Sequence, residues 1–207
     1  MWTQTTTKEY DRAGSYTYQP PDWCNFLSII AVGGGGGGEG SYLIYNPSKG
    51  GGAGKVRHMH FTRANKSPIS VNVGSGGRPG RGQGTNNEAS MNGQPTSVQV
   101  NGATHSVDGG RIGKAAGIVG ENASGSPSTA SQSVLNHHQG VLAYSEARGG
   151  LRPRPGIPGN RGNRGSGGSG SNHASFVGAT IGGAGGDGYV AIVCFGVDPT
   201  LPRLTEG

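Results

Sequence analysis

Large apolar side chains are scarce in this chain. Residues of the hydrophobic types make up 31% of its 207 positions, against about 45–50% in ordinary domains, a figure that also counts glycine. A core built only from large side chains would therefore be thin. The longest apolar runs cover residues 26–32, interrupted by Ser28, and residues 189–195, and both are too short to span a membrane. The length of the chain suits one domain.

Cysteine is almost absent, and so is any export signal. The two cysteines, Cys24 and Cys194, fit neither a disulfide-dense secreted domain nor a zinc site. Residues 1–7 show no basic stretch followed by an apolar one, so we expect synthesis in the cytoplasm without export. In that compartment two buried free thiols are favoured over a disulfide.

Acidic residues are missing from two long stretches. Residues 40–87 hold seven cations and residues 147–186 hold five arginines, with no acid in either stretch. The whole chain carries a formal net charge of +6. Such a field attracts anionic partners, which include nucleic acid, phosphate-bearing cell-wall polymers and acidic subunits.

What the chain has in excess is glycine, with 44 residues. Gly33–Gly38 follow the apolar stretch 26–32 directly, and the glycine-rich residues 182–188 lead into the apolar stretch 189–195. Glycine loses more backbone entropy on ordering than any other residue, so these tracts need partners to stay ordered. Polyglycine adopts an extended threefold helix, and such helices can pack side by side and hydrogen-bond one another. We therefore expect a bundle of polyglycine II helices.

The remaining pattern predicts strands. Alternating or continuous apolar residues predict them over 16–18, 23–32, 41–45, 56–63, 69–73, 96–107 and 189–195. Asn101-Gly102, between two alternating runs, predicts a type I′ hairpin. If the strands over 23–32 and 189–195 pair antiparallel with their glycine ends together, Val32 lies near Tyr189. Cys24 and Cys194 then fall within about three residues of being opposite.

The expected fold class is therefore all-β. A small β-sandwich or jelly-roll-like set of strands would combine with packed polyglycine II helices. Little or no α-helix is expected, because glycine and proline interrupt the chain repeatedly. Residues 132–144 are nevertheless compatible with one short helix, interrupted by Gly140.

Motifs for nucleotides, metals and catalysis are incomplete. The pattern Gly33-x-Gly35-x-x-Gly38 follows a strand, but no helix begins behind it, and residues 50–56 are one residue short of a P-loop. His58 and His60 share one face of a predicted strand, yet no cysteine or carboxylate at ligand spacing completes a metal site. No nucleophile and base form a catalytic pattern. We expect a protein that is not an enzyme and has no metal or cofactor.

Four steps in chain order resemble a known family. They are Trp23 to Gly38, Ile69 to Gly77, the hairpin ending in Asp108-Gly109-Gly110, and Gly182 to Phe195. In that order they resemble the glycine-rich domain of bacteriophage minor tail proteins and tail-tip adhesins, over roughly residues 16–196. The resemblance implies an all-β domain with polyglycine helices, mounted at the distal end of a phage tail. A Gly/Arg/Pro insertion at 148–172 departs from the family's plainer pattern.

The resemblance also implies a division of the chain. We expect an N-terminal docking segment over 1–15, the glycine-rich β domain over 16–196 with its loop at 148–172, and a C-terminal tail over 197–207. The protein would be a structural virion component of the tail tip that contributes to host-cell attachment. Its partners would be other tail proteins, further copies of itself and an anionic polymer of the host envelope. Closed symmetry is usual for repeated subunits, and a homotrimer is favoured.

Arginine-bearing loops are the expected contact surface, because a glycine scaffold leaves recognition to its loops and arginine suits phosphate and carboxylate. The candidate contact residues are Arg78, Arg81, Arg148, Arg152, Arg154, Arg161 and Arg164. The candidate assembly contacts are Trp2, Thr3, Thr5 and Thr7.

The alternative function is that of a Gly/Arg-rich nucleic-acid-binding protein. Arg-Gly segments bind single strands, but they do so together with aromatic side chains on which bases stack. No Phe, Tyr or Trp occurs between residues 145 and 175, which disfavours nucleic acid as a partner.

Overall fold

The computed structural model describes residues 4–40, 50–63, 65–81, 89–112, 125–126, 164–165, 167–168 and 181–196. Within these residues the protein is all-β, with two sheets and no helix, which confirms the expected fold class. The expected strand over 41–45 and the short helix over 132–144 lie outside the described residues.

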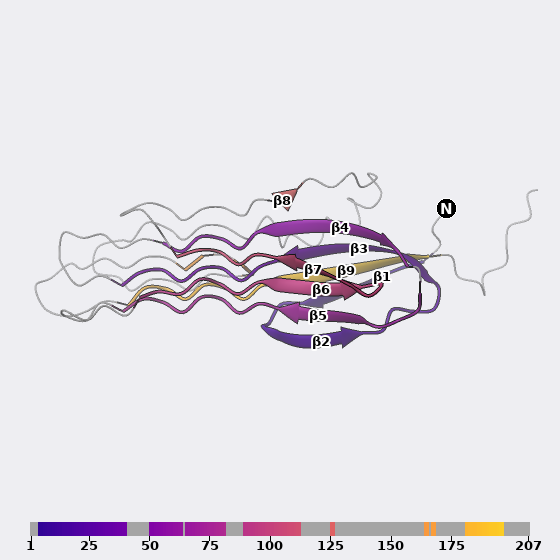
Figure 1. The fold of residues 1–207 in the computed structure, drawn as a ribbon, viewed down its shortest axis with the longest axis horizontal. Coiled ribbons are helices and arrows are strands. Elements are labelled where there is room, and N and C mark those ends of the chain that lie inside the picture. Colours follow the sequence, from indigo (N-terminus) through magenta and orange to yellow (C-terminus); the bar gives the residue numbers. More distant parts are fainter. Residues whose placement is uncertain are drawn as a thin grey trace, which may run out of the picture.

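The two sheets have five and four strands in the described part (Figure 1). The larger sheet has the order β1 (Gln4–Tyr10), β9 (Tyr189–Gly196), β3 (Cys24–Val32), β4 (Val56–Thr62) and β8 (Gly125–Ser126). The smaller sheet has the order β2 (Gly14–Tyr18), β5 (Ile69–Val73), β6 (Thr96–Val100) and β7 (Ala103–Val107). Neighbouring strands are antiparallel except β4 and β8, which are parallel.

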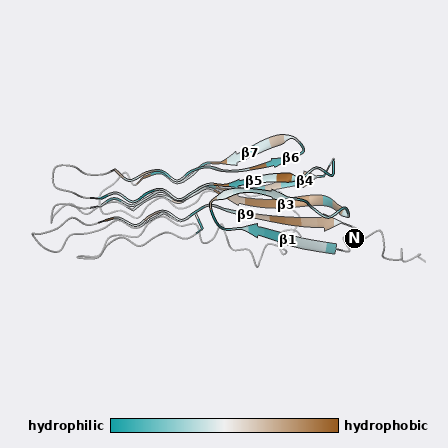
Figure 2. Ribbon diagram, turned by 90° about the horizontal axis from the view of Figure 1, so that it is seen from below, coloured by the Kyte–Doolittle hydropathy of each residue, from teal (hydrophilic) through white to brown (hydrophobic). Residues whose placement is uncertain are grey.

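The main core lies between the sheets. Leu27 and Ile192 of the larger sheet belong to the same buried cluster as Val71 and Val98 of the smaller one. β5 alternates buried and exposed residues, as expected for a strand with one face in water. All eight residues of β9 are buried, and this strand and β3 form the apolar centre of the larger sheet (Figure 2). The long apolar runs in the sequence therefore mark strands covered on both faces.

The predicted pairing of the two glycine-flanked strands is confirmed. β3 and β9 pair antiparallel, and Val32 is the partner of Tyr189. The predicted hairpin is confirmed as well. Asn101 and Gly102 join β6 to β7 with φ angles of 52° and 82°, the left-handed conformation that a type I′ turn requires.

Residues 4–15 belong to the sheets. β1 pairs along its whole length with β9 and forms an edge of the larger sheet. The expected boundary between residues 15 and 16 falls inside β2. This pairing could not be predicted from the sequence, because the Thr-rich β1 has no apolar alternation.

Beyond the sheets the chain continues as extended glycine segments, which we call rods and which run side by side to the far end of the molecule (Figure 1). The central rod covers residues 33–40. Around it, in ring order, are rod A (50–55), rod B (164–165 and 167–168), rod C (181–188), rod D (74–81), rod E (89–95) and rod F (108–112).

The central rod is hydrogen-bonded to all six others. Its N–H groups donate in a repeat of three: Gly33 and Gly36 to rod A, Gly34 and Gly37 to rod E, and Gly35 and Gly38 to rod C. Its carbonyl groups accept N–H groups from rods B, D and F. Each pair of neighbours in the ring also shares at least one backbone hydrogen bond.

This arrangement is a polyglycine II bundle. The threefold repeat is that of a left-handed extended helix, which has no internal hydrogen bonds and must find partners outside itself. Directions alternate around the ring: rods A, C and E run toward the sheets, whereas rods B, D and F run away from them like the central rod. The hexaglycine Gly33–Gly38 is therefore the axis of the bundle, because only a rod surrounded on every side needs glycine at every position.

Candidate functional site

Rod D exposes one side chain per turn. In rod D the exposed residues are Ser75, Arg78 and Arg81, and the glycines between them include the buried Gly77 and Gly80. A helix with three residues per turn places every third side chain on one face. Rod D therefore presents a stripe ending in two arginines, on the half of the rod farther from the sheets.

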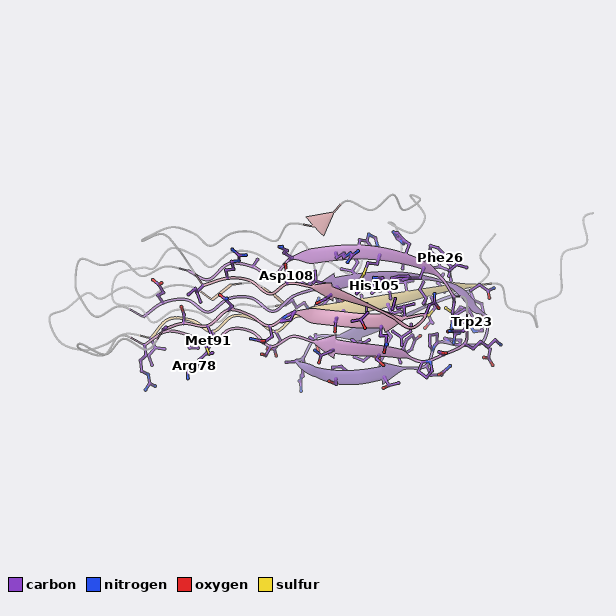
Figure 3. The ribbon with its side chains drawn as sticks, in the orientation of Figure 1. Trp23, Phe26, Arg78, Met91, His105 and Asp108 are labelled. Atoms are coloured by element: carbon purple, nitrogen blue, oxygen red, sulfur yellow. The ribbon has the colours of Figure 1, made fainter. Side chains whose placement is uncertain are left out.

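Neighbouring rods extend this stripe into a wider surface. Ile181 of rod C forms a β-bridge with Arg81. On the other side, the Met91 N–H of rod E donates to the Arg78 carbonyl at 2.9 Å, and the two side chains lie close together (Figure 3). Rod E binds rod F through the side chain of Asn92, whose Oδ1 accepts from the Ile112 N–H at 2.8 Å.

We call this surface the basic band. It comprises Arg78, Arg81, Met91, Asn92, Arg111 and Ile181, all of them exposed. Met91 is 52% exposed and Ile181 38%, and these two are the exposed large hydrophobic side chains in the described part. Two guanidinium groups flanked by two exposed apolar side chains, with Arg111 on the next rod but one, form the combination found at recognition surfaces, where Arg and Met are enriched.

Two of the carboxylates on the rods have other partners. Asp108 of rod F accepts from the Lys55 ammonium of rod A at 2.8 Å, and this bond holds the pKa of the Asp108 carboxyl below its ordinary value. Asp187 of rod C accepts from the backbone N–H groups of Gly76 at 3.0 Å and Ala13 at 3.3 Å. Among the described residues, no ion pair involves Arg78, Arg81 or Arg111. The positive charge of the basic band is therefore available to an anionic ligand.

The remaining expected contact residues are placed differently. Arg164 lies at the sheet end of rod B, half-buried, with its guanidinium 5.0 Å from the centre of the Tyr189 ring. Arg148, Arg152, Arg154 and Arg161 lie outside the described residues. The structure thus brings Arg78 and Arg81 together and sets Arg164 apart from them.

The expected assembly contacts concern the opposite part of the molecule. Thr5 and Thr7 are exposed on β1, at the edge of the larger sheet. Trp2 and Thr3 lie outside the described residues.

Sequence reasoning missed Arg111, Met91 and Ile181. A signal for them exists, since non-glycine residues recur at intervals of three within the tracts, as in Ile181, Ala184 and Asp187. That spacing marks the outward face of a rod, but it does not tell which rods are neighbours.

Histidine and acid side chains provide no metal site in the described part of the chain, where no group of three or more His, Cys, Asp or Glu gathers. His58 and His60 are near each other, with ring centroids 4.6 Å apart, and Ser28 Oγ lies 3.0 Å from His58 Nε2. Nor do the described residues include a helix long and apolar enough to cross a membrane.

Comparison with known proteins agrees with the architecture. No curated protein matches the sequence. A family model described as a glycine-rich domain matches residues 9–195, which is most of the chain. The match begins inside β1 and ends inside β9, so it spans both sheets and all the rods. The chain therefore belongs to the glycine-rich domain family.

Proposed function

We propose that this protein is a non-enzymatic structural component of a bacteriophage tail tip and that it contributes to host-cell attachment through the basic band. The observation that carries the proposal is the exposed arginine cluster on a bundle whose backbone is hydrogen-bonded throughout its centre. Such a scaffold holds a contact surface in a fixed position without a large hydrophobic core. Membership of the glycine-rich domain family and the order of the glycine motifs support it.

The chemistry of the band indicates the class of ligand. Arginine recognises phosphate and carboxylate groups through paired, charge-assisted hydrogen bonds. Envelope polymers of bacteria and acidic faces of neighbouring tail subunits both carry such groups. We propose an anionic envelope polymer as the ligand, with other tail proteins and a closed homo-oligomer, preferably a trimer, completing the assembly. Exposed Thr5 and Thr7 on the edge strand β1 remain candidate contacts for that assembly.

The nucleic-acid alternative is less well supported. Binding of single strands relies on aromatic side chains that stack with bases. The exposed neighbours of the arginines in the basic band are Met91 and Ile181, which are aliphatic. Among the described rod residues, Arg78, Arg81 and Arg111 thus have no stacking platform beside them.

The experiment compares two triple variants in purified phage particles. Arg78→Ser, Arg81→Ser and Arg111→Ser are combined in one protein, and Lys8→Ser, Arg12→Ser and Arg57→Ser in the other. Both sets remove three exposed cations, but the second set lies on the sheets and their connecting turn. Both proteins should fold, because surface substitutions usually change stability by less than about 0.5 kcal/mol.

We expect the parent protein to sediment with tailed particles and to be labelled by antibody at the tail tip. Loss of one charge-assisted hydrogen bond, about 1.5 kcal/mol, lowers an equilibrium constant about tenfold. Adsorption of particles carrying the first variant should therefore fall by at least about tenfold, while the second should adsorb like the parent. Equal adsorption of both variants would refute the assignment of the band. Absence of the protein from particles, with nuclease-sensitive and strongly salt-dependent retention on nucleic acid, would favour the alternative.

A further inference from the structure

The only two cysteines of the sequence meet in the core. Cys24 begins β3 and Cys194 is near the end of β9, and both are buried free thiols. Cys24 is paired with Gly196 and Leu27 with Cys194, with a register shift between Cys24 and Phe26. The extra residue reverses the alternation of β3, so that Cys24 points to the same face as Leu27 and Cys194. Cys24 Sγ donates to the Phe26 carbonyl at 3.6 Å, and the two thiols lie close enough for each to shift the pKa of the other.

Polar groups surround this thiol pair. The Tyr18 hydroxyl of β2 lies 3.5 Å from Cys194 Sγ. The Arg63 guanidinium acts on both thiols with its positive charge. Its Nη1 donates to the Pro21 carbonyl at 2.8 Å, whereas its Nε and Nη2 are buried without an acceptor. Buried donors without acceptors are costly, and a thiolate in this cluster would supply the missing negative charge.

The surroundings distinguish the two sulfur atoms. The interaction with Cys24 lowers the pKa of the Cys194 thiol, and Tyr18 and Arg63 lower it further, against the effect of burial. The same thiol–thiol interaction and burial raise the pKa of Cys24. Because the thiolate is the reactive form of cysteine, Cys194, which has the Tyr18 hydroxyl 3.5 Å from its sulfur, would be the attacking thiol of the pair.

We propose that Cys24 and Cys194 form a redox-active pair that a small peroxide converts into a disulfide joining β3 to β9. The Cys194 thiolate attacks one peroxide oxygen, the O–O bond breaks, and hydroxide leaves and takes a proton to become water. Cys194 is then a sulfenic acid. The Cys24 sulfur attacks the Cys194 sulfur, its proton and the departing hydroxide form a second water, and the S–S bond closes. Two thiols are oxidised and one peroxide is reduced.

Hydrogen peroxide is small enough to reach thiols that a bulky disulfide reagent would reach only after local opening. The product would tie together two strands of the larger sheet whose cysteines are far apart in sequence. Cross-links that close long loops restrict the unfolded chain most, so the oxidised protein should be the more stable form.

The test uses the full chain, reduced, freed of reductant and treated with hydrogen peroxide at neutral pH. After quenching, the protein is unfolded in the presence of a thiol-alkylating reagent. We expect both thiols to be protected from alkylation, the intact mass to fall by the two thiol hydrogens, and a peptide containing Cys24 to be linked to one containing Cys194. The urea midpoint of unfolding should rise, and a reductant should reverse the rise.

Variants assign the roles. Cys24→Ser should stop at a sulfenic acid on Cys194 that a sulfenic-acid-specific reagent traps, whereas Cys194→Ser should react several-fold more slowly. Arg63→Met should slow the reaction most near neutral pH and least at high pH, where the thiolate forms without help. Retention of both alkylatable thiols in the peroxide-treated parent protein would overturn the proposal, whatever the folding of the variants. Oxidation of Cys194 to sulfinic acid without a cross-link would overturn it as well.

Discussion

At the scale of single residues, the bundle depends on the absence of side chains. A Cβ atom built at Gly34 would overlap the backbone carbonyl of Ser75, and one at Gly37 would overlap that of Arg78. These contacts are with backbone that is itself hydrogen-bonded to other rods, so it cannot move without breaking those bonds. Glycine is therefore required here for close approach of backbones, whereas at Gly102 it is required for the positive φ of a turn.

Gly37→Ala should therefore destabilise the protein. Overpacking typically lowers the free energy of unfolding by about 1–3 kcal/mol. Because the added methyl group would meet the hydrogen-bonded Arg78 carbonyl, which cannot move aside, we expect a loss of about 3 kcal/mol or more. The control is Ser75→Ala in the neighbouring rod D, an exposed position where a Cβ is already present. Urea unfolding gives both values, and the control should stay within about 0.5 kcal/mol of the parent. If the two variants were equally stable, the central rod would not be packed as described.

The histidine pair on β4 should make stability depend on pH. Burial, with a contribution from His60, lowers the pKa of His58 to about 4. Because the folded state binds the proton less readily than the unfolded state, the stabilising contribution is complete above about pH 6.5 and is lost as the pH falls toward 4. The full shift would correspond to about 3 kcal/mol. Since His58 is only partly buried, we expect roughly 1–2 kcal/mol.

Urea unfolding between pH 7.5 and pH 4, at about half-unit steps, measures this effect. His58→Asn removes the titrating group and keeps a polar side chain beside Ser28, its partner at 3.0 Å. The difference in unfolding free energy between parent and variant should shrink as the pH falls through this range. A difference that is constant with pH would show that His58 does not titrate as described.

At the scale of elements, the rods replace the usual partners of a strand. A β-strand hydrogen-bonds two neighbours in a plane, whereas the central rod bonds six neighbours arranged around it. The side chains of Asp187 and Thr96 accept backbone hydrogen bonds where the rods meet the sheets. Asp187 accepts the N–H of Gly76, and the buried Thr96 hydroxyl accepts the N–H of Gly74 at 3.0 Å. These side chains thus provide acceptors for backbone N–H groups at the transition from β-strand to polyglycine helix.

Amide exchange provides the test at this scale. All six N–H groups of Gly33–Gly38 donate to neighbouring rods. Their exchange with solvent deuterium should be slower than random-coil rates by several orders of magnitude, close to that of the β3 amides, because opening requires the bundle to come apart. Amides of the exposed turn Asn101–Gly102 serve as the fast internal reference. Random-coil exchange within Gly33–Gly38 would contradict the bundle.

At the scale of the whole molecule, the sheets and the rods lie end to end and have different roles. The sheets contain the apolar core, and the rods, which extend from one end of the sheets, carry the basic band (Figures 1 and 3). The low content of large apolar residues is thereby explained, because much of the buried material in the rods is glycine backbone. This division allows the outer residues of the rods to vary with little effect on folding.

Much of this arrangement follows from the sequence alone. The long apolar runs determined β3 and β9, the Asn101-Gly102 pair determined the hairpin of β6 and β7, and the glycine tracts between strong strands required ordered partners. Arg78 and Arg81 could be identified as a candidate contact because they are close in sequence. Local patterns of this kind depend on propensities that each segment carries by itself.

Only the tertiary structure decided which rods are neighbours. Glycine tracts offer the same backbone donors and acceptors to one another, so no side chain in the sequence distinguishes one partner from the next. Ring order is settled by the sheets, which fix where each rod begins, and by the alternation of direction that their connections impose. That order places Met91 and Ile181 on the two rods that flank Arg78 and Arg81, and Arg111 on the rod beyond Met91. It could not be deduced beforehand, because the band is assembled from four separate rods, one of which, rod C, is far from the others in the chain.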